Sequence, residues 1–255
     1  MPTTRRALLT GAAVLPFSSL LSSADAAIGE RELTFRSGAS RIRVDLLSGP
    51  GSGAPASAVI MLHGADGPRG NAMYRAGARA IAAAGFNVYF VHYLDRTGEM
   101  RASLASMFRN FPAWMNVVAD ALTFVEGRPE ADRDRIAVVG ISLGAALGLA
   151  VASSDRRIRA AVHYSGPVAH ETVAKNTRLP PLLVLHGAAD RIVPVANAHA
   201  VEALAREQGT PVEVVIYPGQ GHGFHGAAAE DAMQRTLAFL KHRLTREEAG
   251  RAPAG

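Results

Sequence analysis

The chain of 255 residues contains no cysteine. It can therefore form no disulfide framework, thiolate metal site or iron–sulfur cluster, and it offers no cysteine nucleophile. It also lacks any block of Lys and Arg residues, and its formal net charge is only +5. Nucleic-acid binding is not indicated by this charge, which we interpret as a contribution to solubility.

Long apolar runs are equally scarce. The N-terminal apolar stretch, 7–21, contains glycine, proline and serine, and it is shorter than the ~20 residues that span a bilayer. It follows Arg5 and Arg6 and precedes the tripeptide ADA at 24–26, a pattern typical of a twin-arginine export signal with its cleavage site. The alternative is an apolar N-terminal helix or membrane anchor. We expect residues 1–26 to be the signal, and the mature protein to be periplasmic or secreted, with no membrane segment.

From residue 27 onward, no repeat or linker divides the chain, and 48% of all residues are apolar, which is enough for a sizeable core. Short apolar runs alternate there with longer segments of helical pattern. Strands are predicted at 30–35, 41–47, 58–62, 86–93, 136–139, 160–163, 182–185 and 212–217. Helices are predicted at 73–84, 103–125, 143–152, 195–208 and 227–244, with Pro112 interrupting or starting the second. This alternation implies a single α/β domain over 27–255, with a mostly parallel sheet covered on both faces.

The pentapeptide GISLG, residues 140–144, stands between a strand of the buried type and a helix. This is the context of the G-x-S-x-G turn, in which small neighbours let strand and helix approach closely and the serine hydroxyl projects. Ser142 is therefore the candidate nucleophile, and the backbone N–H of Leu143 can point at a developing oxyanion. The alternative interpretation is a tight structural turn.

Asp190 and His222 each follow a different predicted strand, and the carboxyl ends of parallel strands meet at one edge of the sheet. A carboxylate there can hold a histidine in the tautomer that accepts a serine proton. Taken alone, Asp190 could instead cap a helix or pair with Arg191, and His225 competes with His222 for the role of base. The chain order serine, aspartate, histidine favours a triad of Ser142, Asp190 and His222.

The sequence HGADG follows the predicted strand at 58–62. Its position suits a second oxyanion donor, the backbone N–H of Ala65. We interpret His63 as a structural residue beneath this loop and Asp66 as a turn former. No metal or cofactor is expected.

Substrate contacts are predicted from loops near this edge, at Tyr93, Arg96 and Phe224. Arg96 could bind a substrate carboxylate through two hydrogen bonds, although an ion pair with Asp95 or Glu99 on a solvated loop is the simpler interpretation. The segment 165–180 lacks periodicity and is a candidate lid or rim that would set specificity.

The pieces MLHGADG, VHYLDRTGE, AVVGISLGAALGLA, LLVLHGAADRIVP and VIYPGQGHGFHG occur in this order over residues 58–226. Together they resemble the dienelactone hydrolase family of the α/β-hydrolase fold, which implies a mostly parallel sheet of about eight strands with helices on both faces. By this resemblance Ser142 is the nucleophile, Asp190 the orienting acid and His222 the base. The founding members use a cysteine nucleophile and work in the cytoplasm, so the chain resembles a serine-bearing branch that includes esterases.

The expected function is hydrolysis of a small-molecule carboxylic ester or lactone through an acyl-enzyme. An acyltransferase or a peptidase could use the same triad. A non-catalytic, hydrolase-like binding protein is the alternative from a different class. The sequence indicates no oligomeric state.

Overall fold

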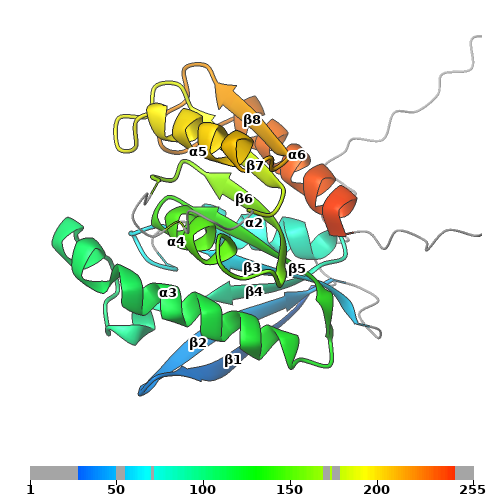
Figure 1. Cartoon of the computed structure of the whole chain (residues 1–255). Coiled ribbons are helices and arrows are strands. Elements are labelled where there is room, and N and C mark those ends of the chain that lie inside the picture. Colours follow the sequence, from blue (N-terminus) through cyan, green and yellow to red (C-terminus); the bar gives the residue numbers. More distant parts are fainter. Residues whose placement is uncertain (1–27, 50–54, 70–71, 169–172, 174–178, 245–255) are drawn as a thin grey trace, which may run out of the picture.

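One mixed sheet organises the structure, a computed structural model that describes residues 28–49, 55–69, 72–168, 173 and 179–244 (Figure 1). The expected export signal, 1–26, and most of the candidate lid lie outside these residues. The strands are β1 (Gly29–Ser37), β2 (Ser40–Ser48), β3 (Ala56–Leu62), β4 (Asn87–Val91), β5 (Ala131–Ile141), β6 (Ile158–Tyr164), β7 (Leu182–Gly187) and β8 (Val212–Tyr217). Their order in the sheet is β1-β2-β4-β3-β5-β6-β7-β8.

Strands β3 to β8 run parallel, whereas β1 and β2 form an antiparallel hairpin that joins the sheet along β4. The central strands are mostly apolar and almost entirely buried, as expected for strands covered on both faces. The chain leaves β3, β5, β7 and β8 at the same edge of the sheet. The loops that carry Ala65, Ser142, Asp190 and His222 therefore meet there.

Helices cover both faces of the sheet (Figure 1). They are α2 (Ala72–Ala83), α3 (Leu104–Glu126), α4 (Leu143–Ala152), α5 (Ala196–Glu207) and α6 (Ala227–Leu244), with a 3₁₀ turn η1 (Tyr93–Arg96). Helices α3, α4 and α5 pack on one face, and α2 and α6 pack on the other. The predicted α/β fold with a mostly parallel sheet is confirmed. None of the described helices is both long and apolar enough to cross a membrane.

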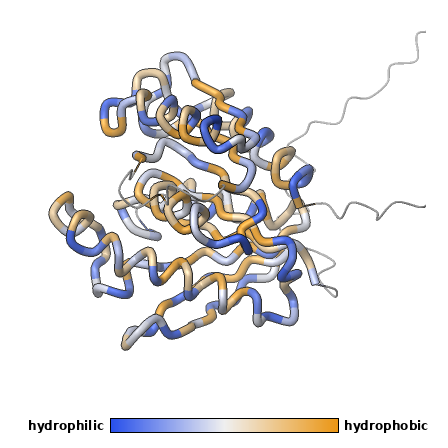
Figure 2. Tube along the Cα trace, viewed as in Figure 1, coloured by the Kyte–Doolittle hydropathy of each residue, from blue (hydrophilic) through white to orange (hydrophobic). Residues whose placement is uncertain are grey.

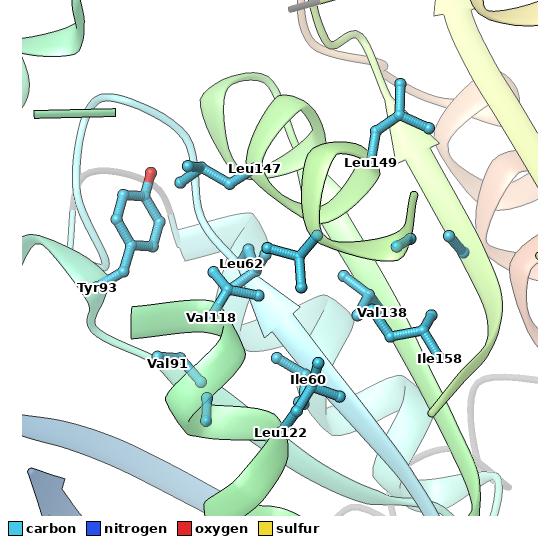
Figure 3. Packing of buried hydrophobic residues seen from close by; sticks show 14 of the residues in the cluster. Ile60, Leu62, Val91, Tyr93, Val118, Leu122, Val138, Leu147, Leu149 and Ile158 are labelled. Atoms are coloured by element: carbon cyan, nitrogen blue, oxygen red, sulfur yellow. The ribbon is translucent and has the colours of Figure 1, made fainter. Parts of the chain in front are cut away.

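Apolar side chains fill the space between the sheet and the helices. Figure 2 shows hydrophobic residues concentrated along the central strands and α4, whose ten residues are all buried. On the α3–α4 face, Val118 and Leu122 of α3 and Leu147 of α4 pack above Ile60 and Leu62 of β3 (Figure 3). The core therefore anchors β3, β5 and α4, the elements that flank the serine turn.

Several boundaries differ from the prediction, and the largest difference is in β5, which begins at Ala131 and not at 136. Strand β4 ends at Val91, and Tyr93 begins the turn η1, because its buried side chain packs beneath the loop after β3. Helix α3 begins at Leu104 and continues through Pro112 without interruption. Ser103 caps it in a reciprocal pair with Ser106, and burial of Trp114 and the following apolar residues offsets the backbone hydrogen bond lost at the proline.

Candidate active site

Ser142 lies at the sharp turn between β5 and α4. Its φ of 54° and ψ of −118° place it in a region that non-glycine residues rarely adopt. The glycines on either side make this turn possible. A Cβ on Gly140 would lie 2.4 Å from the carbonyl oxygen of Gly144, and a Cβ on Gly144 would lie 2.4 Å from that of Leu62. Close backbone packing, which only glycine permits at these two positions, therefore stabilises the strained backbone conformation of Ser142.

We expect Gly144→Ala to lower the free energy of unfolding by about 3 kcal/mol, because the new methyl group meets rigid backbone oxygens of Leu62 and His63. Gly77→Ala is the matched control. A Cβ there would meet only the flexible ends of Met233, at 3.4 Å, and Met61, at 3.7 Å, and alanine favours the helix. Urea titrations of the two variants measure the difference. Equal stability of both variants would contradict the packing argument.

Ser142, His222 and Asp190 form one continuous hydrogen-bonded chain. His222 Nε2 lies 3.0 Å from Ser142 Oγ, and His222 Nδ1 lies 2.8 Å from Asp190 Oδ2. The Asp190 side chain is fully buried, whereas that of His222 is 24% exposed. The structure thus brings together the three side chains that the sequence singled out. His225, the competing histidine, lines the same cavity, and its backbone N–H donates to Gln220 Oε1.

The loop after β7 holds Asp190 in place. Its Oδ1 accepts the backbone N–H groups of Ile192 and Val193, both at 2.9 Å. Burial alone would raise the pKa of the Asp190 carboxyl, but the hydrogen bonds from His222, Val193 and Ile192 outweigh it, and the pKa lies below its ordinary value. Asp190 is therefore ionised at neutral pH and can orient the imidazole.

His186 is a supporting residue that the sequence did not reveal. It is fully buried at the end of β7, and its Nε2–H donates to the carbonyl oxygen of Val193 at 2.8 Å. The same nitrogen lies 3.3 Å from Asp190 Oδ2. His186 thus ties the Asp190 loop to the strand. In the sequence, a histidine directly before a glycine at the end of a strand gives no local signal of this role.

The backbone N–H groups of Leu143 and Ala65 are the predicted oxyanion donors. Leu143 is the first residue of α4, where the N–H groups have no partner within the helix. Ala65 lines the cavity beside Ser142, and a Cβ on the neighbouring Gly64 would lie 3.5 Å from the Ser142 Cβ. A hydrogen bond fixes the position of Ala65, because its carbonyl oxygen accepts the backbone N–H of Ala102 at 2.7 Å. The loop after β3 therefore contacts the serine turn.

Tyr74 supports this loop from α2, a role that the sequence also did not reveal. The Gly64 N–H donates to the Tyr74 hydroxyl at 3.2 Å, and that hydroxyl donates to Asp66 Oδ1 at 2.6 Å. Asp66, expected only as a turn former, thus has a partner on a helix. The signal was weak because a lone tyrosine on an amphipathic helix is usually a core residue.

A cavity of about 460 Å³ opens at Ser142 and His222. Its walls come from β3, β5, α2, α6 and the loops after β3 and β8. Phe224, one of the predicted substrate contacts, lines it. Within the described residues, no group of three or more His, Asp and Glu side chains is arranged to hold a metal ion.

Tyr93 and Arg96, the other two predicted substrate contacts, do not line this cavity. Tyr93 is fully buried, stacks on His63, and donates its hydroxyl to the His63 carbonyl oxygen at 2.8 Å. Arg96 turns towards the β1–β2 hairpin, where it donates to Ser40 Oγ at 3.3 Å and packs on Gly38. Asp95, which was expected to pair with Arg96, binds Arg43 instead. The pairing of β2 with β4 brings the hairpin to these residues, and local sequence does not show such a contact.

Two histidines remain neutral in the core. Burial lowers the pKa of His63 from 6.5 to about 3 and the pKa of His163 from 6.5 to about 4. His63 lies beneath the loop after β3, as predicted, and is fully buried, while His163 in β6 is 2% exposed. Neither imidazole can take up a proton near neutral pH unless it becomes exposed to solvent.

The free energy of unfolding should therefore fall as the pH decreases from 7 towards 4. The unfolded chain protonates these histidines below its pKa near 6.5, but the folded chain does not, so acid favours unfolding. Each of the two histidines should lower the free energy of unfolding by about 2 kcal/mol at pH 5. Urea titrations at pH 7 and pH 5 measure this loss, which should be about 2 kcal/mol smaller in His163→Leu. The same loss in both proteins would contradict the assignment.

The comparisons with known proteins agree with this geometry. The model of the dienelactone hydrolase family matches residues 45–244, which include Ser142, Asp190 and His222. The chain belongs to the dienelactone hydrolase family. A structure described as a dienelactone hydrolase from Klebsiella pneumoniae matches 84% of this chain and 98% of its own, with a TM-score of 0.73 and 19% identity. This likeness confirms the α/β-hydrolase fold.

Two curated relatives of this dienelactone hydrolase family member match shorter stretches. A "Putative carboxymethylenebutenolidase" of Methylorubrum extorquens is 28% identical over 114 residues, 41% of this chain and 39% of the relative. "Acyl-coenzyme A thioesterase 2, mitochondrial" of Mus musculus is 30% identical over 192 residues, 72% of this chain and 39% of the relative. The chain thus spans well under half the length of each.

Proposed function

We propose that the protein is a serine hydrolase that cleaves carboxylic ester or lactone bonds through an acyl-enzyme. The observation that carries this proposal is the unbroken chain from Ser142 Oγ through His222 to the buried Asp190 carboxylate. Membership of a hydrolase family supports the same chemistry. A small-molecule substrate fits the cavity of about 460 Å³ beside the serine.

In the first half-reaction, His222 Nε2 takes the proton of Ser142 Oγ as the oxygen attacks the carbonyl carbon. The N–H groups of Leu143 and Ala65 bind the resulting oxyanion, and each aligned donor contributes about 3 kcal/mol. Protonated His222 then gives its proton to the leaving alcohol. Ionised Asp190 stabilises the imidazolium through Nδ1–H without taking the proton.

Water completes the reaction. His222 removes a proton from a water molecule, whose oxygen attacks the acyl carbonyl, and the second oxyanion occupies the same site. Collapse of this intermediate returns the proton to Ser142 Oγ and releases the acid. No step requires a metal or a cofactor. The same steps could also cleave an amide, or transfer the acyl group to an acceptor other than water. Product analysis with added alcohol or amine separates a hydrolase from an acyltransferase.

Labelling with a fluorophosphonate tests the proposal. The reagent phosphonylates an activated serine, so the native protein should carry one label and Ser142→Ala none. A non-catalytic binding protein would not react, and a label that persists in Ser142→Ala would assign the chemistry to another residue. A panel of p-nitrophenyl esters beside simple lactones then identifies the preferred bond.

We also propose that residues 1–26 direct export to the periplasm or the medium, which rests on the sequence pattern alone. N-terminal sequencing of the exported protein tests cleavage before Ala27. Retention of the intact N-terminus in the cytoplasm would contradict it.

A further inference from the structure

The cavity beside Ser142 extends into the space between α2 and α6. Met61 and Val139 form its floor on β3 and β5, Ile81 and Gly77 its α2 wall, and Met233 belongs to α6. These groups are apolar. The polar groups at the α6 wall are already paired, since the Tyr164 hydroxyl lies 2.6 Å from Thr236 Oγ1 and donates to the Ala232 carbonyl oxygen.

Gly77 keeps this space open. A glycine inside a helix costs about 1 kcal/mol relative to alanine, so its presence calls for a physical reason. Close backbone packing, which explains Gly140 and Gly144, does not apply here. A Cβ on Gly77 would meet only the terminal methyl carbons of Met233 and Met61, at 3.4 and 3.7 Å, and both of these side chains line the cavity. The side chain absent at position 77 therefore leaves free volume in the cavity.

The position of this space relative to the triad indicates which half of an ester occupies it. His222, which must protonate the leaving alcohol, follows β8, while α2 packs on β2 and β4 at the other side of β5. The leaving group therefore lies towards His222, Phe224 and His225. The acyl group points the other way, towards α2.

We propose that the α2–α6 cavity binds an unbranched, uncharged acyl chain of medium length, and that Gly77 and Met233 determine the length accepted. The proposal rests on the serine hydrolase function given above and assigns its substrate class. Apolar walls favour an alkyl chain. No lysine or arginine is among the described residues that line the cavity, so a carboxylate at the chain's far end would be desolvated without a cationic partner. The preferred substrates are thus neutral fatty acyl esters and not carboxylated lactones.

The test compares kcat/KM for p-nitrophenyl esters from acetate to dodecanoate. We expect a rise of about three- to fourfold for each added methylene until the cavity is filled, followed by a decline. The monoester of adipic acid should react about 100-fold more slowly than the hexanoate ester, which has the same length without the carboxylate.

Gly77→Leu should fill the α2 wall and lower the octanoate-to-acetate ratio of kcat/KM by about tenfold or more. Ala76→Leu, which introduces the same side chain at the exposed neighbouring position, should leave that ratio unchanged. Met233→Ala should move the preference towards longer chains. Since it removes bulk, it tests the cavity even where Gly77→Leu folds poorly.

A profile that falls steadily from acetate, or a ratio unaffected by both Gly77→Leu and Met233→Ala, would overturn the assignment. Such a result would leave the serine mechanism standing, provided that acetate hydrolysis still depends on Ser142. Loss of that dependence would instead overturn the proposed function itself. Faster reaction of the adipate monoester than of the hexanoate would assign the cavity to acidic substrates.

Discussion

Ser142→Ala should lower kcat for ester hydrolysis by about 10⁴-fold or more, because it removes the atom that forms the acyl-enzyme. The residual rate would come from the oxyanion donors and from substrate binding. The variant should fold normally, since the Ser142 hydroxyl faces the cavity and alanine is smaller. Initial rates with the preferred p-nitrophenyl ester measure the effect.

Ser154→Ala is the matched control for this experiment. Ser154 lies just beyond α4, is exposed, and donates its hydroxyl only to the Val151 carbonyl oxygen. Its replacement should change kcat by less than about twofold. A Ser142→Ala protein that retains more than a tenth of the native rate would rule out the serine mechanism.

Asp190→Asn should lower kcat by a comparable amount, about 10³- to 10⁴-fold, while leaving the fold intact. The amide oxygen can still accept the backbone N–H groups of Ile192 and Val193, which bind Oδ1. That orientation turns the amide NH₂ towards His222 Nδ1, where the carboxylate oxygen had been. The imidazole must then carry its proton on Nε2, which faces Ser142, and it can no longer act as a base.

Asp231→Asn provides the control for the same chemical change. Asp231 is 43% exposed on α6, where it binds Arg235 and the Tyr217 hydroxyl outside the cavity. The kcat of the Asp231→Asn variant should stay within about twofold of the native value. Asp190→Asn with native kcat and native stability would show that the carboxylate does not orient the base.

The sequence predicted most of the fold because its signals are local. Helices α4 and α6 and strand β8 have the predicted bounds. Small and apolar residues fill α4, Gly226 precedes α6, and β8 lies between Pro211 and Pro218. The gathering of Ser142, Asp190 and His222 also followed from the sequence. Parallel strands carry their C-terminal loops to one edge, whatever the details of packing.

What the sequence could not predict depends on contacts between distant segments. Tyr93 and Arg96 follow β4 at the edge of the sheet where the site lies. Tyr93 instead binds the loop after β3, and Arg96 binds the β1–β2 hairpin, so neither side chain reaches the cavity. Two walls of the cavity are faces of the helices α2 and α6. The apolar periodicity of such a helix is the same whether its face packs on a core or borders a cavity. Only the packed structure shows that Gly77 borders free volume.

The most direct test of the account is the capture of the acyl-enzyme. The protein is mixed with a hindered, slowly deacylating p-nitrophenyl ester, quenched in acid, digested with trypsin and analysed by tandem mass spectrometry. We expect the acyl mass on Ser142 within the peptide 136–156, and no adduct in either Ser142→Ala or His222→Ala. Turnover of the ester with the acyl mass on another residue, or with no covalent adduct at all, would contradict the account.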